Sequence, residues 1–303
     1  MNRIVPAFLL LSLLIVSAAA KDHAAMIVTT AWLSEHLNDK SLVLLHVGDR
    51  KEYDAEHLPG AQFISTRDIS TPQEPGRLIL EMPAIEQLKE AFEKLGVSND
   101  SRIVIYFGKD WVSPAARVYF TLDYLGLGDQ TSMLDGGMPA WKAENRPLTA
   151  EIRTPVRGTL TPKPQRELIA DAAWLRSNLN KPKVAIIDSR LPRFYEGTDP
   201  GSMPRAGHIP GAMNVPFTSL VTEPGLKFKD KAALSSLYKN AGADAGDTVV
   251  TYCHIGQQAS LGYFVAKYLG YKARLYDGSF DEWSRHADWP IEGSKAAETP
   301  KQK

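Results

Sequence analysis

The chain repeats itself in order. Short blocks of the first half return in the second half in the same succession. The matching blocks are 43–47 with 184–190, 56–61 with 206–212, 102–107 with 248–253, 124–126 with 268–270, and 134–141 with 276–283. A repeat of this length exceeds the unit of a solenoid, which reaches about 50 residues at most. It therefore predicts two tandem domains of the same fold, in agreement with a length of 303 residues.

Each half alternates β-rich runs with helical patterns. In the second half we expect strands at 183–188, 248–252 and 273–276. We expect helices at 174–179, 230–241 and 258–269, the first of them with Asp171 as its N-cap. Strands separated by helices predict a parallel α/β sheet, in which sites form at the carboxyl ends of the strands.

The repeats and the composition between them set the predicted domain boundaries. The first domain takes residues 26–150 and the second takes residues 169–292. Residues 151–168 form the predicted linker, because this stretch carries prolines at 155, 162 and 164 and has little periodicity. Residues 293–303 are polar, and we predict a disordered tail there.

The first twenty residues have the pattern of a secretory signal peptide. Arg3 precedes an apolar run at 4–16, and small residues at 17–20 predict cleavage after Ala20. The alternative is a membrane anchor, but the apolar run is shorter than the roughly 20 residues that span a bilayer. No second apolar stretch of spanning length follows in the sequence. We therefore expect a periplasmic or secreted protein with no stable membrane span after cleavage.

The charge and the histidines exclude some classes of function. Lys and Arg together number 35, as do Asp and Glu, and the zero net charge argues against a dedicated nucleic-acid binder. The histidines show no ligand spacing with other donor residues, so neither a metal nor an organic cofactor is predicted. They stand at positions 23, 36, 46, 57, 208, 254 and 286. The sequence identifies no protein partner.

The chain has a single cysteine, Cys253, directly after the predicted strand 248–252. A short loop then opens onto the next predicted helix. Backbone N–H groups and the dipole at a helix N-terminus favour the thiolate, which is the reactive form. The alternative is a small, buried and inert residue, since free cysteine is among the most buried residue types. One cysteine forms no internal disulfide, so a lone thiol in an exported protein is either inert or functional.

Together these blocks resemble the rhodanese family of sulfurtransferases in its tandem-domain form. The motifs are Gly-His-Ile-Pro-Gly-Ala at 207–212, Asp-Ser-Arg at 188–190, and Asp-Gly-Ser at 277–279 followed by Trp283. The resemblance implies two rhodanese-like domains, each a central parallel sheet with helices on both faces. In tandem members the second domain carries the cysteine loop and the first is inactive. Phe107 fits that pattern, because it stands at the position that matches Cys253.

The resemblance implies a two-step transfer of sulfur. Cys253 takes the outer sulfur of a small anionic donor and becomes a persulfide, and a thiophilic acceptor such as cyanide or a thiol removes it. Backbone N–H groups of the loop are expected to stabilise the charged sulfur; the residues are His254, Ile255, Gly256, Gln257 and Gln258. The His254 side chain either contributes charge or faces solvent as an ordinary loop residue.

The anionic donor needs a cation near the thiol. Arg193 matches the family's substrate-binding arginine, although Pro192 replaces a glycine and one extra residue precedes Gly197. The alternative is an exposed surface arginine. Arg190 and Arg205 are weaker candidates, and we expect Arg190 to be a structural partner of Asp188. Structural roles are also expected for His208, Asp277 and Trp283.

The loop sequence departs from both common types of the family. Residues 253–256 read Cys-His-Ile-Gly, whereas thiosulfate-type members have Cys-Arg-Lys-Gly and mercaptopyruvate-type members have Cys-Gly-Ser-Gly. Ser202 and Met203 stand near the place of the second arginine expected of mercaptopyruvate-type enzymes. We favour thiosulfate as the donor and retain 3-mercaptopyruvate as the other candidate.

The residues of the cysteine loop also distinguish sulfur transfer from other functions of a reactive cysteine. A phosphatase on this fold needs a Cys-x5-Arg loop, and Ala259 stands where the arginine would be. A cysteine protease needs a distant histidine around the thiol, which the adjacent His254 does not supply. A non-catalytic binding or sulfur-sensing module remains the alternative. The complete loop at 253–258, with Gly256 at its centre, favours catalysis.

Overall fold

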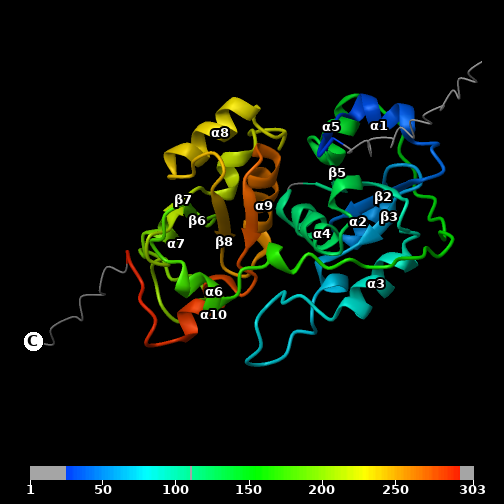
Figure 1. The fold of residues 1–303 in the computed structure, drawn as a ribbon. Coiled ribbons are helices and arrows are strands. Elements are labelled where there is room, and N and C mark those ends of the chain that lie inside the picture. Colours follow the sequence, from blue (N-terminus) through cyan, green and yellow to red (C-terminus); the bar gives the residue numbers. More distant parts are fainter. Residues whose placement is uncertain (1–24, 110, 294–303) are drawn as a thin grey trace, which may run out of the picture.

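The computed structural model describes residues 25–109 and 111–293. Within these residues two parallel sheets lie side by side, each flanked by helices (Figure 1). The predicted fold class of two tandem α/β domains, each with a central parallel sheet and helices on both faces, is confirmed. The predicted signal peptide at 1–20 lies outside the described residues, as does the predicted tail apart from Gly293.

The first domain is built on a sheet with the strand order β1-β5-β4-β2-β3 in the described residues, and every neighbouring pair is parallel. Its strands are β1 (Ile27–Val28), β2 (Leu42–Val47), β3 (Gln62–Ile64), β4 (Arg102–Phe107) and β5 (Thr131–Leu134). Its helices are α1 (Thr30–His36), α2 (Arg50–Ala55), α3 (Ile85–Lys94), α4 (Ser113–Tyr124) and α5 (Gly137–Ala143).

The second domain repeats this plan with the described strand order β7-β6-β8-β9. Its strands are β6 (Val184–Asp188), β7 (Met213–Asn214), β8 (Thr248–Tyr252) and β9 (Lys272–Leu275). Its helices are α6 (Ala172–Ser177), α7 (Pro192–Tyr195), α8 (Lys231–Asn240), α9 (Gln257–Leu269) and α10 (Ser279–Arg285). A single parallel bridge between Ile169 and Leu275 takes the place of β1.

The predicted elements of this domain are present, with small shifts at their ends. The strand predicted at 248–252 is β8 without change, and the other predicted strands begin one residue later or earlier. The helix predicted at 174–179 is instead α6, which begins two residues earlier. The Asp171 side chain accepts a hydrogen bond from the Trp174 N–H, so the cap was correct, but the helix begins directly after it.

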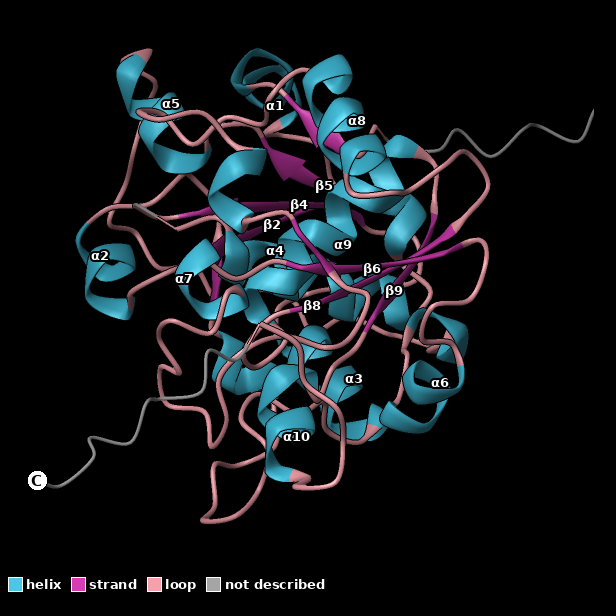
Figure 2. Ribbon diagram, turned by 90° about the vertical axis from the view of Figure 1, so that its left-hand side faces the viewer, coloured by secondary structure: helices cyan, strands magenta, loops and turns pink. Residues whose placement is uncertain are grey.

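The helices cover both faces of each sheet (Figure 2). Residues that alternate along β2 and β4 belong to different core clusters: Leu45 and Ile105 face α3 and α4, whereas Leu44 and Tyr106 face α1, α2 and α5. In the second domain the α8–α9 face belongs to the same cluster as the α3–α4 face of the first. The two domains therefore share one hydrophobic core.

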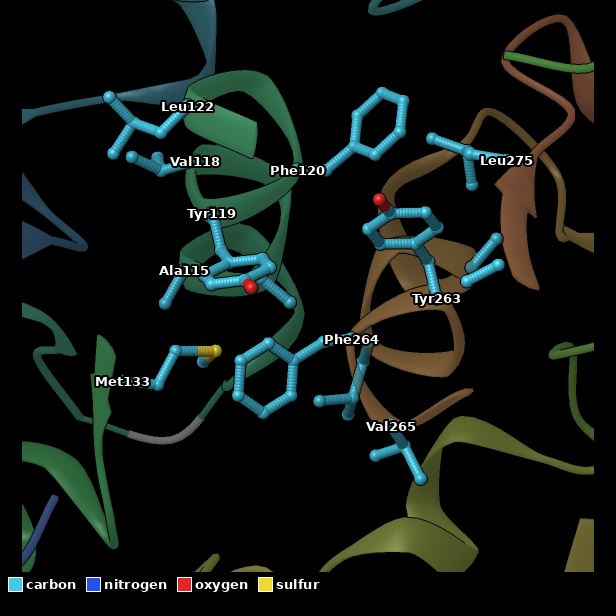
Figure 3. Packing of buried hydrophobic residues seen from close by; sticks show 14 of the residues in the cluster. Ala115, Val118, Tyr119, Phe120, Leu122, Met133, Tyr263, Phe264, Val265 and Leu275 are labelled. Atoms are coloured by element: carbon cyan, nitrogen blue, oxygen red, sulfur yellow. The ribbon is translucent and has the colours of Figure 1, made fainter. Parts of the chain in front are cut away.

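Helices α4 and α9 form the centre of this shared core, between the two sheets (Figure 1). Tyr119 contacts Phe264 edge to face, with ring centroids 4.7 Å apart, and Phe120 contacts Tyr263 in the same way at 4.9 Å (Figure 3). Aligned on the repeated Tyr-Leu-Gly, Tyr119 is equivalent to Tyr263 and Phe120 to Phe264. The interface is therefore pseudo-symmetric: exchanging each residue of one contact for its equivalent in the other domain gives the second contact.

The segment predicted as a linker contains no helix or strand between residues 150 and 165. It nevertheless packs against the first domain. Leu160 is buried and donates its N–H to the Glu93 side chain, and the Lys163 N–H donates to the Leu125 carbonyl. The connection is thus fixed along α3 and the end of α4.

Candidate active site

Cys253 lies at the carboxyl end of a central strand. Strand β8 ends at Tyr252, the thiol follows, and α9 begins at Gln257. The side chain of Cys253 is buried, with an exposed fraction of 1%. Strand, short loop and helix N-terminus together form the arrangement that the sequence predicted for this residue.

Backbone amides surround the sulfur, but burial dominates its ionisation. Burial raises the pKa of the Cys253 thiol above its ordinary value, and the Asp188 charge adds to this. Backbone N–H groups of Ala259, Ile255 and Gln258 act in the opposite direction. The loop amides favour the thiolate, as expected, but desolvation outweighs them in the resting thiol.

The turn between β9 and α10 holds the cysteine loop from one side. Cys253 donates its N–H to the Ser279 hydroxyl at 3.2 Å and accepts at its carbonyl from the Phe280 N–H at 2.9 Å. The His254 carbonyl accepts from the Asp281 N–H, also at 2.9 Å. Gly256 closes the loop in the left-handed region at φ +81°, a conformation that favours glycine. The loop geometry is thus set by the residues that follow β9.

His254 is half-buried and packs edge-on against the ring of Phe194, with centroids 4.6 Å apart. Burial, together with the nearby Arg190 charge, lowers the pKa of His254 to about 4. The imidazole is therefore neutral at pH 7. The expectation of a charge contribution is therefore wrong, and the ring is partly exposed rather than fully solvent-facing.

Arg193 lies on α7, next to the Phe194 that contacts His254. Its guanidinium pairs with Asp199 at 3.2 Å and lies over the Phe194 ring, and its side chain is 54% exposed. The structure places this arginine on the element beside the loop, with its charge engaged by Asp199. A role in binding a donor stays a prediction.

Arg190 and His208 have the structural roles that we expected, whereas Arg205, a weaker candidate for the donor cation, bonds the backbone of its own domain. Arg190 is buried and donates to both oxygens of Asp188, and it also donates to the Gly207 carbonyl. Arg205 donates to backbone carbonyls at the end of α10. His208 stacks on Tyr195 and hydrogen-bonds the carbonyl of that residue. The first domain repeats this last arrangement with His57 on Tyr53.

The corresponding end of the sheet in the first domain has other residues at the positions of Cys253, Asp188 and Arg190. Phe107 occupies the position equivalent to Cys253, and the loop to α4 is longer than the loop to α9. His46 takes the place of Asp188 in the strand, and Gly48 that of Arg190. A cavity of about 460 Å³ remains there, lined by Asp49, Lys109 and Trp111 among others and reached by Gln257 from the second domain.

Sequence reasoning missed Arg117 and the full role of Asp277. Arg117 lies on α4 of the first domain, is fully buried, and pairs with Asp277 at 2.5 Å. Asp277 begins the turn that holds the cysteine loop, whereas the sequence predicted only a structural role for it. The available signal was a charged residue inside the otherwise apolar stretch 115–120. Trp283 is a buried core residue, as predicted.

The described part of the chain carries neither a cluster of metal ligands nor a membrane-spanning helix. In residues 25–109 and 111–293 no group of three or more His, Cys, Asp or Glu side chains could hold a metal ion. Over the same residues no helix is long and apolar enough to cross a membrane.

Comparison with known proteins identifies the family. The model of the rhodanese-like domain matches residues 29–144 and 171–286, one match for each half. The chain therefore belongs to the rhodanese-like family, in its tandem form. The two matches also confirm the duplication read from the sequence.

Similar proteins of named activity indicate the class of function within this family. The chain is 34% identical over 287 residues to the sulfur carrier protein TtuD of Thermus thermophilus, covering 89% of this chain and 97% of the relative. It is 30% identical over 272 residues to the thiosulfate sulfurtransferase of Azotobacter vinelandii, covering 88% and 97%. These relatives and the family support an enzyme of the sulfurtransferase class.

Solved structures agree with this class. The 3-mercaptopyruvate sulfurtransferase SseA of Escherichia coli is 25% identical with a TM-score of 0.74, covering 84% of this chain and 99% of SseA. The wild-type structure of EanB has a TM-score of 0.79 at 20% identity, covering 89% of this chain and 70% of EanB, and shows the fold alone.

Proposed function

We propose that this sulfurtransferase moves a sulfane sulfur from a small anionic donor to a thiophilic acceptor through a persulfide on Cys253. The observation that carries the proposal is the loop itself. The only cysteine of the chain lies after a central strand, with N–H groups of Ile255, Gln258 and Ala259 directed at its sulfur. Such donors stabilise negative charge that develops on sulfur during the reaction.

The proposed chemistry takes two displacements. The Cys253 thiolate attacks the outer sulfur of thiosulfate, the S–S bond of the donor breaks, and sulfite leaves with the bonding electrons. The acceptor then attacks the terminal sulfur of the persulfide. With cyanide the products are thiocyanate and the thiolate of Cys253, so the enzyme returns to its starting state without an oxidant or a reductant.

Thiosulfate is the favoured donor, and 3-mercaptopyruvate is the other candidate. The resemblance to a named thiosulfate sulfurtransferase across 97% of that protein supports thiosulfate. Arg193 is the proposed donor-binding cation, because it lies on the helix whose Phe194 contacts the cysteine loop. Only Nε of Arg193 bonds Asp199, so its two terminal NH2 groups are the proposed donors to the anion.

The Arg193 assignment predicts a selective change in kinetics. Arg193→Gln should raise the KM for thiosulfate roughly tenfold while kcat changes little, since a charge-assisted hydrogen bond is worth about 1.5–3 kcal/mol. Steady-state rates of thiocyanate formation measure this. Lys51→Gln is the matched control, because Lys51 has the equivalent place on α2 and is exposed. An unchanged KM in Arg193→Gln would remove Arg193 from the binding site.

The persulfide is tested by the intact mass of the purified protein before and after thiosulfate. Wild type should gain one sulfur atom, cyanide should remove it, and Cys253→Ala should gain none. The same experiment with 3-mercaptopyruvate decides between the donors. No gain with either donor would contradict the proposed function.

A non-catalytic module that binds or carries sulfur is the second candidate. The burial of the thiol and its raised pKa favour it, as does the resemblance to a protein named as a sulfur carrier. The two candidates differ in turnover. Repeated formation of thiocyanate by one protein molecule indicates an enzyme, whereas a single stoichiometric transfer indicates a carrier.

We also propose that the protein is exported, on the pattern of residues 1–20 alone. Expression of the whole chain in a bacterium, followed by fractionation and N-terminal sequencing, tests this. A periplasmic product that begins at Lys21 supports export with cleavage after Ala20. A cytoplasmic product that keeps residues 1–20 contradicts it.

A further inference from the structure

Arg117 links the first domain to the cysteine loop of the second. It lies on α4, and its guanidinium is fully buried between the domains. Its Nη1 donates to the Asp277 carboxylate at 2.5 Å, its Nη2 donates to the Leu80 carbonyl at 2.7 Å, and its Nε is buried without a hydrogen-bond partner among the described residues. The second oxygen of Asp277 accepts from the Met82 N–H at 3.1 Å. Two segments of the first domain thus hold one side chain of the second.

Asp277 begins the turn to which the cysteine loop is bonded. Ser279 and Phe280, two and three residues further on, bond the backbone of Cys253. The guanidinium also borders the loop directly. A Cβ atom built on Gly256 would lie 3.0 Å from Arg117 Nη1 and 3.1 Å from the Asp277 carbonyl oxygen. Arg117 thus contacts the turn through Asp277 and lies directly beside the cysteine loop.

The equivalent positions of the two domains show that the arginine–aspartate pair is present at Asp277 and has no counterpart at Asp135 within the described chain. Asp135 is the equivalent of Asp277. Its carboxylate accepts a hydrogen bond from the backbone N–H of Phe228 in the second domain, as the Asp277 carboxylate does from the N–H of Met82. The position equivalent to Arg117 is Leu261, which is apolar and buried. A buried cation is expensive unless it is paired, so its presence only on the cysteine side needs a reason.

We propose that Arg117 is a positioning residue of the first domain, which holds the cysteine loop in its reactive geometry through Asp277. This inference rests on the proposed function of Cys253. It assigns a role in sulfur transfer to a domain that lacks the cysteine. The backbone N–H groups stabilise a charged sulfur only when the loop holds them in line with it, and small displacements of reacting groups are costly.

The test compares Arg117→Leu, which installs the residue of the equivalent position, with Asp135→Asn as the matched control on the other side. Arg117→Leu should lower kcat roughly 10- to 100-fold with the KM for thiosulfate within about twofold, because Arg117 does not touch the donor. Asp135→Asn should keep both parameters within about twofold. Asp277→Asn should resemble Arg117→Leu, and the double variant Arg117→Leu/Asp277→Asn should lose little more than either.

Thermal unfolding of each variant separates positioning from stability. Rates are compared at a temperature at which circular dichroism shows all variants folded. A kcat of Arg117→Leu within twofold of wild type would overturn the proposal. Equal losses in Arg117→Leu and Asp135→Asn would also overturn it, since any damage to the interface would then suffice.

A second readout keeps this inference distinct from the proposed function. Alkylation of Cys253 by iodoacetamide needs no sulfur donor. Release of the loop should expose the buried thiol and accelerate alkylation in Arg117→Leu but not in Asp135→Asn. If wild type forms no persulfide, the proposed function fails while this rate still tests the positioning. If wild type is active and alkylation is unchanged in Arg117→Leu, the positioning role fails alone.

Discussion

At the scale of single residues, the environment of Cys253 combines opposed influences. Three backbone N–H groups favour the thiolate, and nearly complete burial disfavours it. The sequence was sufficient to place the thiol, because the strand, the loop and the following helix are all evident in it. It could not predict the balance, because the extent of burial depends on the α10 turn and on the first domain, both distant in sequence.

The raised pKa of Cys253 predicts how its reactivity changes with pH. Because the thiolate is the nucleophile and the folded protein disfavours it, alkylation should keep accelerating as the pH rises past 9. The chain has one cysteine, so intact mass after timed exposure to iodoacetamide measures this residue alone. A rate that reaches its plateau below pH 8 would contradict the raised pKa.

His46 predicts a loss of stability in acid. Burial lowers the pKa of this fully buried residue from 6.5 to about 4. Between these values the unfolded chain binds a proton that the folded chain does not, so stability falls as the pH is lowered from 6.5 towards 4. The loss attributable to His46 is on the order of 3 kcal/mol at the lower limit.

Urea unfolding of wild type and His46→Gln at several pH values tests this prediction. The variant should lose less stability than wild type between pH 6.5 and 4.5. Part of the pH dependence should remain, because the pKa of His254 is lowered in the same direction. Parallel curves for the two proteins would show that His46 does not contribute.

At the scale of elements, the helix pair α4 and α9 determines how the domains join. The sequence predicted α9 almost to its first residue, because an apolar pattern follows the cysteine loop. It did not predict that α4 and α9 face each other. Both helices are apolar around most of their surface, so periodicity alone does not show which face meets a neighbouring domain.

Phe264→Ala should therefore destabilise the whole protein. The ring is fully buried and contacts Tyr119 and Phe228. Removal of a buried phenylalanine ring costs about 3–5 kcal/mol through lost burial and the cavity left behind. Chemical unfolding measures the loss, and Trp111→Ala, at a residue that is 45% exposed, serves as the control. A loss below about 1 kcal/mol in Phe264→Ala would mean that the interface repacks.

At the scale of the whole molecule, one core cluster extends through both domains. The domains should consequently unfold together. Differential scanning calorimetry should give one transition whose calorimetric and van't Hoff enthalpies agree. Two resolved transitions would show that each domain is stable without the other. Tandem duplication was visible in the sequence, whereas the merging of the two cores became evident only from the packing.

The pseudo-symmetric interface has a consequence for separated halves of the chain. Asp123 on α4 and Lys267 on α9 occupy equivalent positions, and they bond each other at 2.5 Å. In a pair of two first domains, Asp123 would face a second Asp123; in a pair of two second domains, Lys267 would face Lys267. Like charges at this partly buried contact disfavour such pairs, whereas the mixed pair neutralises both charges. Severed from one another, the halves are complementary in charge and would select each other over copies of themselves.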